Sequence, residues 1–195
     1  MDPTSYALLL ALVLSKEELR FEFCHEQGYD TSCGLTVAAT LLDVYYDIGT
    51  DEFELIERVL KDKIEQGDFT ISLADMAQAL TGYGLACRAY KMDVSALEKA
   101  LEKGFAPIIV HYDRPETHFA LVLGMKDGSV ITVDPARGME ALEEAEFLRR
   151  YSGIAMLVAG QGKVVNLDRL EQAMGFALGK RDLLEKASRM AGCGW

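Results

Sequence analysis

The hydrophobic period of this chain changes near residue 84, and that change constrains the fold more than any other feature. Before it, the segment 34–46 is rich in Ala, Leu and Val without a breaker, which predicts a buried helix, and apolar residues recur at helical spacing in 52–66. Ser72 with Asp75 resembles a capping box that opens a short helix ending at Gly82. After residue 84, β-rich runs separated by turn residues occupy 84–91, 107–112, 118–124, 129–134 and 155–159, with helical stretches at 95–103 and 142–151. Helices followed by antiparallel strands predict an α+β fold.

Three segments follow from this pattern. Residues 1–18 contain an apolar run at 6–14, which is typical either of a signal remnant or of a packed N-terminal helix. Residues 19–160 form the predicted domain. Residues 161–195 form a C-terminal helical extension with Asn166 as its N-cap, and this helix is a candidate for a partner or dimer contact. The localisation stays open: a signal remnant indicates an extracytoplasmic protein, and a packed helix indicates a cytoplasmic one.

Charge and composition exclude several classes of partner. The formal net charge is −11, and such a surface repels phosphate backbones and anionic membranes, so no nucleic-acid partner is expected. No apolar run approaches the roughly 20 residues that a membrane span requires. The four cysteines (Cys24, Cys33, Cys87 and Cys193) lack the paired spacing of a zinc site and are too sparse for a disulfide scaffold. We therefore expect neither a metal nor a cofactor.

Cys33 is the candidate nucleophile. It precedes Gly34 at the start of the predicted helix 34–46, where the positive end of the helix dipole favours thiolate over thiol. Gly34 also leaves room for a substrate carbonyl to approach the sulfur. A buried structural cysteine at a helix start is the competing interpretation of the same pattern.

Of the three histidines, His25, His111 and His118, the last is the candidate base. It opens a predicted strand whose hairpin partner ends in Asp134. A three-residue loop at 126–128 would place Ala120 opposite Asp134 and put His118 on the same face as Asp134, within side-chain reach. A two-residue loop would send His118 to the opposite face. The hypothesis of a catalytic pair therefore requires the three-residue loop.

This geometry assigns a role to each of four residues. Asp134 orients the imidazole of His118, which withdraws the proton of Cys33 and later protonates the leaving amine. Gln27 lies six residues before Cys33, and its side-chain NH2 group is a candidate donor to the oxyanion. A loop residue that caps a backbone group is the alternative role for Gln27.

Three segments of the sequence carry a family resemblance. The segments 27–34, 118–124 and 133–138 resemble the bacteriocin-processing, double-glycine-leader peptidases of the papain-like superfamily, over about residues 19–159. The resemblance implies a Cys33-His118-Asp134 triad with Gln27 in the oxyanion hole, and cleavage after Gly or Gly-Gly. Transporter-linked members have Asp directly before the cysteine, whereas here Asp30 lies three residues before it, as in stand-alone relatives. The sequence also contains no Walker motif.

The leading hypothesis is therefore a bacterial thiol peptidase that takes a peptide or protein substrate. Two alternatives remain at this stage: a non-catalytic peptide-binding module with the same fold, and an amide or acyl transferase that uses the same triad.

Overall fold

A single antiparallel sheet organises the molecule. The computed structural model describes residues 19–29, 31–65, 68 and 70–192. The sheet has six strands in the order β1-β6-β2-β3-β4-β5, and every neighbouring pair is antiparallel. The strands are β1 (Leu85–Lys91), β2 (Ile108–Tyr112), β3 (His118–Lys126), β4 (Ser129–Asp134), β5 (Gly138–Glu143) and β6 (Tyr151–Gly160).

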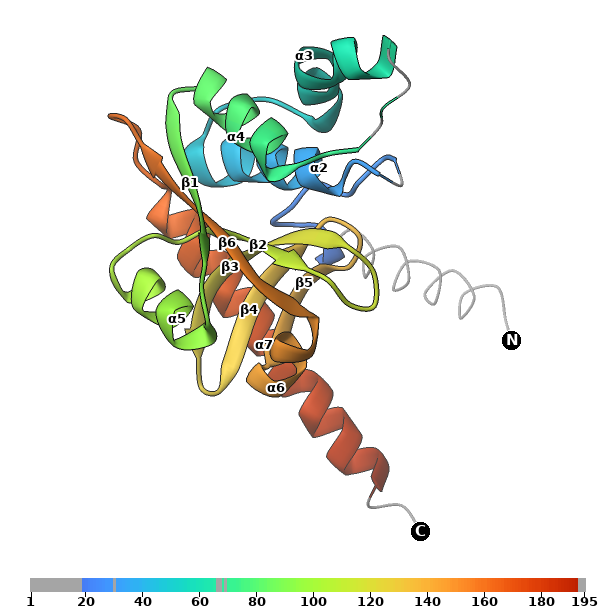
Figure 1. The fold of residues 1–195 in the computed structure, drawn as a ribbon. Helices are drawn as coiled ribbons and strands as arrows, with labels where there is room; N and C mark the ends of the chain where they lie inside the picture. Colours follow the sequence, from blue (N-terminus) through green and yellow to red (C-terminus); the bar gives the residue numbers. More distant parts are fainter. Residues whose placement is uncertain (1–18, 30, 66–67, 69, 193–195) are drawn as a thin grey trace, which may run out of the picture.

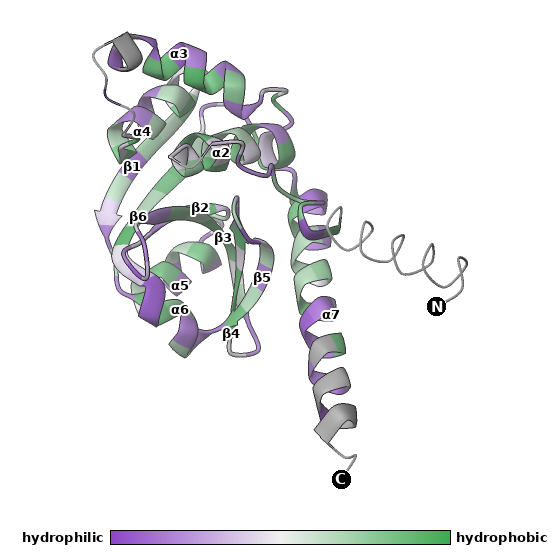
Figure 2. Ribbon diagram, turned by 90° about the vertical axis from the view of Figure 1, so that its right-hand side faces the viewer, coloured by the Kyte–Doolittle hydropathy of each residue, from purple (hydrophilic) through white to green (hydrophobic). Residues whose placement is uncertain are grey.

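Helices cover both faces of this sheet. The helical segments are α2 (Cys33–Thr40), its π-helical continuation η1 (Leu41–Tyr45), α3 (Glu52–Glu65), α4 (Leu73–Gly82), α5 (Val94–Glu102), α6 (Glu144–Arg150) and α7 (Leu167–Gly192). Helices α2 and α4 contact the sheet and α3 packs on them, whereas α5 and α6 lie in the hollow of the curved sheet (Figures 1 and 2). Helix α7 runs along β3, β4 and β5 on the outer side.

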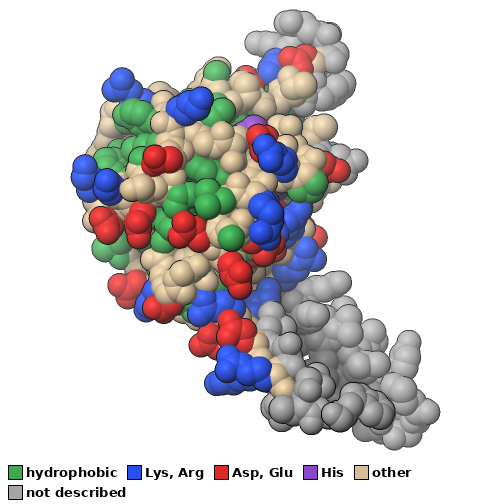
Figure 3. Space-filling view, turned by 60° about the horizontal axis from the view of Figure 1, so that its bottom comes forward, with side chains coloured by type: hydrophobic (Ala, Val, Ile, Leu, Met, Phe, Trp, Pro, Cys, Tyr) green, Lys and Arg blue, Asp and Glu red, His purple; other side chains and the backbone are tan. Residues whose placement is uncertain are grey.

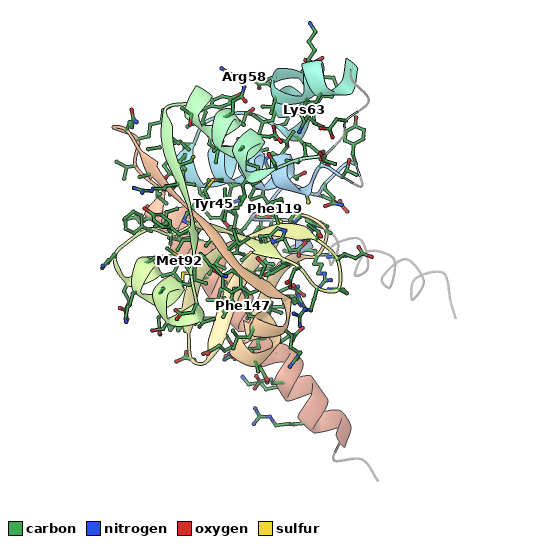
Figure 4. The ribbon with its side chains drawn as sticks, in the orientation of Figure 1. Tyr45, Arg58, Lys63, Met92, Phe119 and Phe147 are labelled. Atoms are coloured by element: carbon green, nitrogen blue, oxygen red, sulfur yellow. The ribbon has the colours of Figure 1, made fainter. Side chains whose placement is uncertain are left out.

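The alternation of side chains along the strands explains this layering. On β4, Ile131 and Val133 join the hydrophobic cluster shared with α2, whereas Val130 joins the cluster shared with α5 and α6. Phe119 on β3 belongs to the first cluster and Phe147 on α6 to the second, on opposite sides of the sheet (Figure 4). All six residues of β4 are buried, as expected for a strand covered on both faces.

The structure confirms the predicted α+β class and most of the elements. The capping box of Ser72 and Asp75 is present, and Asn166 caps α7 by accepting a hydrogen bond from Arg169 N at 3.0 Å. Strand β5 was not predicted, and β6 begins at Tyr151 rather than Ala155. The predicted segment 1–18 and Cys193 lie outside the described residues, and the division of the chain into three segments stays a prediction.

Surface charge, helix hydrophobicity and the glycines of α7 are the features that concern the predicted partners. Acidic and basic side chains are interspersed around exposed hydrophobic groups on the face shown in Figure 3. No helix among the described residues is long and apolar enough to cross a membrane. On α7, a Cβ added at Gly175 or Gly179 meets nothing within 4 Å, so neither glycine marks a close contact within the described chain. A dimer contact through α7 stays a prediction.

The segment that precedes α2 is bound to the loop that follows β4. Arg20 donates from Nε to the Arg137 carbonyl at 2.7 Å and from an Nη to the Ala136 carbonyl at 2.8 Å. Gln27 N donates to the Pro135 carbonyl at 3.0 Å. Residues more than 100 positions apart in sequence are thereby joined beside Asp134.

Gly138→Ala is expected to lower the free energy of unfolding by at least about 2 kcal/mol, because a strained backbone costs about 1–3 kcal/mol and a steric overlap adds to it. The φ angle of Gly138 is +76°, and an added Cβ would lie 2.2 Å from the Arg20 carbonyl oxygen. Gly128 is the matched control, since its φ is +73° and an added Cβ meets nothing within 4 Å. Denaturant unfolding of both alanine variants measures the difference, and equal losses would contradict the importance of the Arg20 contact.

Candidate active site

Cys33 is the first residue of α2 and is partly exposed. Ser32, at the N-cap, does not cap the helix with its side chain but donates from Oγ to the Tyr29 carbonyl at 2.7 Å. Its hydroxyl therefore does not occupy the first amides of α2. Cys33 consequently lies at the positive end of the α2 dipole.

Gly34 has a different role from the one predicted. It is buried, and an added Cβ would lie 2.8 Å from Ile71 Cγ2 and 3.0 Å from Met76 Sδ. The absence of a side chain therefore lets the first turn of α2 pack closely against α4 and the segment before it. The space at Gly34 is filled by this packing and not left for a substrate.

His118 and Asp134 are hydrogen-bonded to each other. The distance from His118 Nε2 to Asp134 Oδ1 is 2.9 Å. One ring nitrogen is thus used by the carboxylate, so Nδ1 is the atom left for the sulfur. Cys33 also acts on the imidazole of His118 and raises its pKa. The structure therefore brings the predicted nucleophile, base and orienting residue together.

The hairpin that achieves this is not the predicted one. Lys126 pairs with Ser129, so the loop has two residues, Asp127 and Gly128, both with positive φ (52° and 73°). This combination is typical of a type I′ turn. The prediction of a three-residue loop is wrong.

A β-bulge restores the register that the pair requires. The pairing shifts between Val122 and Gly124, so that Val122 lies opposite Thr132 and Leu121 opposite Val133. Continuing this register places Ala120 opposite Asp134, which is the predicted alignment. The extra residue of the bulge compensates for the shorter loop and returns His118 to the face of Asp134.

Asp134 is fixed from several directions. Its side chain is 1% exposed, and Oδ1 also accepts from Ala136 N at 2.8 Å and Arg137 N at 3.1 Å. Burial acts to raise the pKa of Asp134, but the hydrogen bond and charge of His118 and the backbone donors outweigh it, and the pKa is lowered. The group is therefore a carboxylate, and its orientation does not depend on His118 alone.

The imidazole of His118 is held in its charged form. Burial acts to lower its pKa, but hydrogen bonds to Asp134 and Cys33 and the charges of both groups raise it to about 9. The side chain is 19% exposed, enough for contact with a bound substrate. The arrangement favours an imidazolium beside the carboxylate of Asp134.

Gln27 lies in the loop before α2, partly buried, and its backbone is tied to Pro135, directly after Asp134. Its Oε1 atom is buried and has no hydrogen-bond partner among the described residues. The side chain is thus not engaged as a backbone cap through that oxygen, which was the alternative role considered for it.

The remaining cysteines and histidines have other environments. Burial raises the pKa of Cys24 to about 12 and that of Cys87 to about 11, so neither is a ready nucleophile. His25 contacts Asp43 Oδ2 at 2.9 Å, and His111 Nδ1 contacts Ser152 Oγ at 2.9 Å. Among the described residues, no group of three or more His, Cys, Asp or Glu side chains is arranged to hold a metal ion.

Two residues next to the site, Arg20 and Glu52, could not be identified from the sequence. Arg20 binds the carbonyls that follow Asp134, and Glu52 accepts a hydrogen bond from Gly28 N at 2.8 Å, next to Gln27. Both contacts join side chains to backbone atoms that are remote in the sequence. Rules based on residue spacing in the sequence do not detect such contacts, which are found only once the fold is known.

Comparisons with known proteins point to one family. The model of the Peptidase C39 family matches residues 23–163. A relative from Pseudomonas aeruginosa, named "Probable functional amyloid protease FapD", is 29% identical over 157 residues, which cover 80% of this chain and 68% of the relative. A Pseudomonas fluorescens protein of the same name is 30% identical over 161 residues, covering 80% and 69%.

Solved structures share the fold. The peptidase domain of Streptococcus ComA, a bifunctional ABC transporter, superposes with a TM-score of 0.60 at 22% identity, covering 71% of this chain and 98% of that one. A double glycine motif protease from an AMS/PCAT transporter, solved with a leader peptide, has a TM-score of 0.52 at 22% identity, covering 72% and 90%.

The family match and the protease-named relatives identify a papain-like cysteine peptidase. The family match spans well over half of the chain, and the protein belongs to the Peptidase C39 family. The enzyme interpretation is thereby confirmed over that of a non-catalytic binding module. Helix α7 begins at Leu167, after the matched residues end at 163.

Proposed function

We propose that Cys33, His118, Asp134 and Gln27 form the catalytic machinery, and that the enzyme cuts a peptide bond that follows glycine, with a Gly-Gly pair preferred. The hydrogen bond of 2.9 Å between His118 and Asp134, with Cys33 as the second partner of the same imidazole, is the observation that supports the triad. No metal or cofactor takes part in the proposed reaction.

In the acylation step, the thiolate of Cys33 attacks the scissile carbonyl carbon. The oxyanion accepts hydrogen bonds from the Gln27 NH2 group and the Cys33 backbone N–H. The imidazolium of His118 gives its proton to the leaving nitrogen as the C–N bond breaks, which leaves a thioester on Cys33.

In the deacylation step, neutral His118 takes a proton from water, and the resulting hydroxide attacks the thioester carbonyl. The C–S bond then breaks, releasing a carboxylic acid product and regenerating the thiolate–imidazolium pair. Asp134 stays ionised throughout and keeps the imidazole in position.

The preference for glycine is drawn from similar proteins. One superposable structure is titled as a double glycine motif protease in complex with a leader peptide. The two Pseudomonas relatives are named as proteases of functional amyloid. We therefore propose a peptide or protein substrate that presents glycine on the acyl side of the cleaved bond.

A pair of fluorogenic peptides tests this proposal. A peptide ending in Gly-Gly-aminomethylcoumarin is expected to release the dye at least about 10-fold faster than a matched peptide ending in Leu-Leu, since side-chain differences in a pocket are worth about 10- to 200-fold. Equal rates would contradict the glycine preference. Mass spectrometry with an added amine should find the free acid, and an amide adduct as the main product would indicate acyl transfer.

A further inference from the structure

Glu52 connects the loop that carries Gln27 to the helix that carries the nucleophile. It lies in the first turn of α3 and is partly buried. Its Oε2 accepts from Gly28 N at 2.8 Å, and its Oε1 accepts from Thr36 Oγ1 at 2.7 Å. Thr36 is buried on α2, one turn after Cys33. A single carboxylate therefore joins the residue after Gln27 to the helix that begins at Cys33.

The contact with Gly28 is close. A Cβ added at Gly28 would lie 2.9 Å from Glu52 Oε2. A side chain at this position would displace the flexible end of Glu52 from its contact with the Gly28 backbone.

Gln27 depends on these backbone contacts for its placement. Its own N–H is bound to the Pro135 carbonyl at 3.0 Å, and the next N–H is bound to Glu52. Its side-chain Oε1 has no hydrogen-bond partner among the described residues. The backbone of Gln27 is consequently anchored on both sides of Cα, and Glu52 is one of the two groups that hold it.

We propose that Glu52 is a positioning residue that holds the side-chain NH2 group of Gln27 in register with the sulfur of Cys33. The inference rests on the proposed role of Gln27 as an oxyanion donor. Glu52 makes no ion pair with a described residue, so its charge serves the two donors that it binds. It does not touch the reacting atoms and acts only through the loop.

The geometry also predicts which substitution is tolerated. In Glu52→Gln, the carboxamide oxygen still accepts from Gly28 N. The new NH2 group donates to Thr36 Oγ1, whose own proton turns to the Ser32 carbonyl, already 3.1 Å away. The connection therefore survives the loss of charge. Glu52→Ala removes both contacts and leaves the loop held only at Pro135.

The test compares two reactions of the same sulfur. Hydrolysis of the Gly-Gly-aminomethylcoumarin peptide needs the oxyanion donors, whereas alkylation of Cys33 by iodoacetamide forms no oxyanion. Glu52→Ala is expected to lower kcat/KM for hydrolysis by about 10- to 100-fold, because a displacement of about 1 Å costs up to about 100-fold. The alkylation rate of Cys33 should not change. Glu52→Gln should retain hydrolysis close to wild type.

Glu57→Ala is the matched control, since Glu57 is an exposed residue on α3 with no hydrogen bond or ion pair to another described residue. It should leave both reactions unchanged. Equal losses in Glu52→Ala and Glu52→Gln would overturn the proposal in favour of a charge effect. Parallel losses of hydrolysis, alkylation and melting temperature in Glu52→Ala would overturn it in favour of a purely structural role.

A double-mutant cycle separates this inference from the proposed function. Gln27→Ala alone should lower kcat/KM by about 10²- to 10³-fold, and adding Glu52→Ala should cost no more. If Gln27→Ala lowers hydrolysis and Glu52→Ala does not, only the positioning role falls. If Gln27→Ala has no effect, the oxyanion assignment falls and the positioning role falls with it.

Discussion

Replacing Cys33 with alanine is expected to lower peptide hydrolysis by on the order of 10⁶-fold, because the nucleophile and the acyl-enzyme are both lost. The side chain is partly exposed at the start of α2, so the smaller residue is accommodated without opening a core cavity. Circular dichroism and the melting temperature should therefore stay near those of the wild type. Release of aminomethylcoumarin from the Gly-Gly peptide measures the loss.

Labelling of the wild type and of Cys33→Ala tests which cysteine reacts. In the wild type, iodoacetamide at neutral pH should label Cys33, and this label should be absent from the variant. Cys24 and Cys87 should resist in both proteins because burial raises their pKa values to about 12 and about 11. Peptide mapping identifies each labelled thiol and separates Cys193 from the rest. Cys87→Ala is the control and should keep full activity. Hydrolysis that persists in Cys33→Ala would assign the nucleophile elsewhere.

Asp134→Ala is expected to lower kcat/KM by about 10³- to 10⁴-fold, since loss of the orienting carboxylate of a triad typically costs up to about 10⁴-fold. The substitution removes the acceptor at 2.9 Å from His118 Nε2 and releases the imidazole to other orientations. It also leaves the amides of Ala136 and Arg137 without their acceptor. The unfolding free energy must therefore be measured beside the kinetics.

Asp134→Asn separates orientation from charge. Ala136 N and Arg137 N hold the Oδ1 position, so the carboxamide oxygen should stay there and still accept from His118. This variant should lose less than the alanine variant, within the ceiling of about 10⁴-fold for loss of a triad carboxylate, since a neutral hydrogen bond to the ring is retained. Equal losses in the two variants would show that the charge, and not the orientation, matters most.

The pH dependence follows from the same pair. The imidazolium of His118 has a pKa raised to about 9, so wild-type hydrolysis should fall as the pH rises through about 9. The ion pair also adds stability that is fully present below the ordinary histidine pKa of about 6.5 and is lost as the pH rises through about 9. In Asp134→Asn the descending limb of the rate profile should move to lower pH, because the carboxylate charge that favours the imidazolium is gone. A limb that does not move would contradict the assignment to His118.

The sequence was sufficient to predict the α+β architecture and to name candidate site residues. Helical spacing in the first half, alternating strands in the second half and the capping box before Leu73 are local signals, and each produced the expected element. Cys33, His118 and Asp134 became candidates because each lies at the end of such an element. Strand β5 was not predicted because its sequence, Gly-Met-Glu-Ala-Leu-Glu, is rich in residues that favour a helix. Pairing with β4 overrides that preference.

The route by which His118 meets Asp134 was not predictable from sequence. The loop has one residue fewer than required, and the shift at Leu123 compensates, so two local deviations cancel. A bulge depends on neighbouring strands and on packing, as here against Met174 of α7, which approaches Gly124. Turn rules applied to the hairpin alone predicted the observed alignment of Ala120 with Asp134, but from a three-residue loop where the structure has two residues and a bulge.

The bonds from Arg20 and Gln27 to the loop 134–138 have a consequence during synthesis of the chain. A nascent polypeptide that has emerged only as far as its helices possesses the sulfur, but it has neither imidazole nor carboxylate to activate it. Contacts between residues so far apart form late in folding, since closing a long loop costs entropy before the contacts repay it. The proposed catalytic residues can therefore come together only after the hairpin of β3 and β4 has been synthesised.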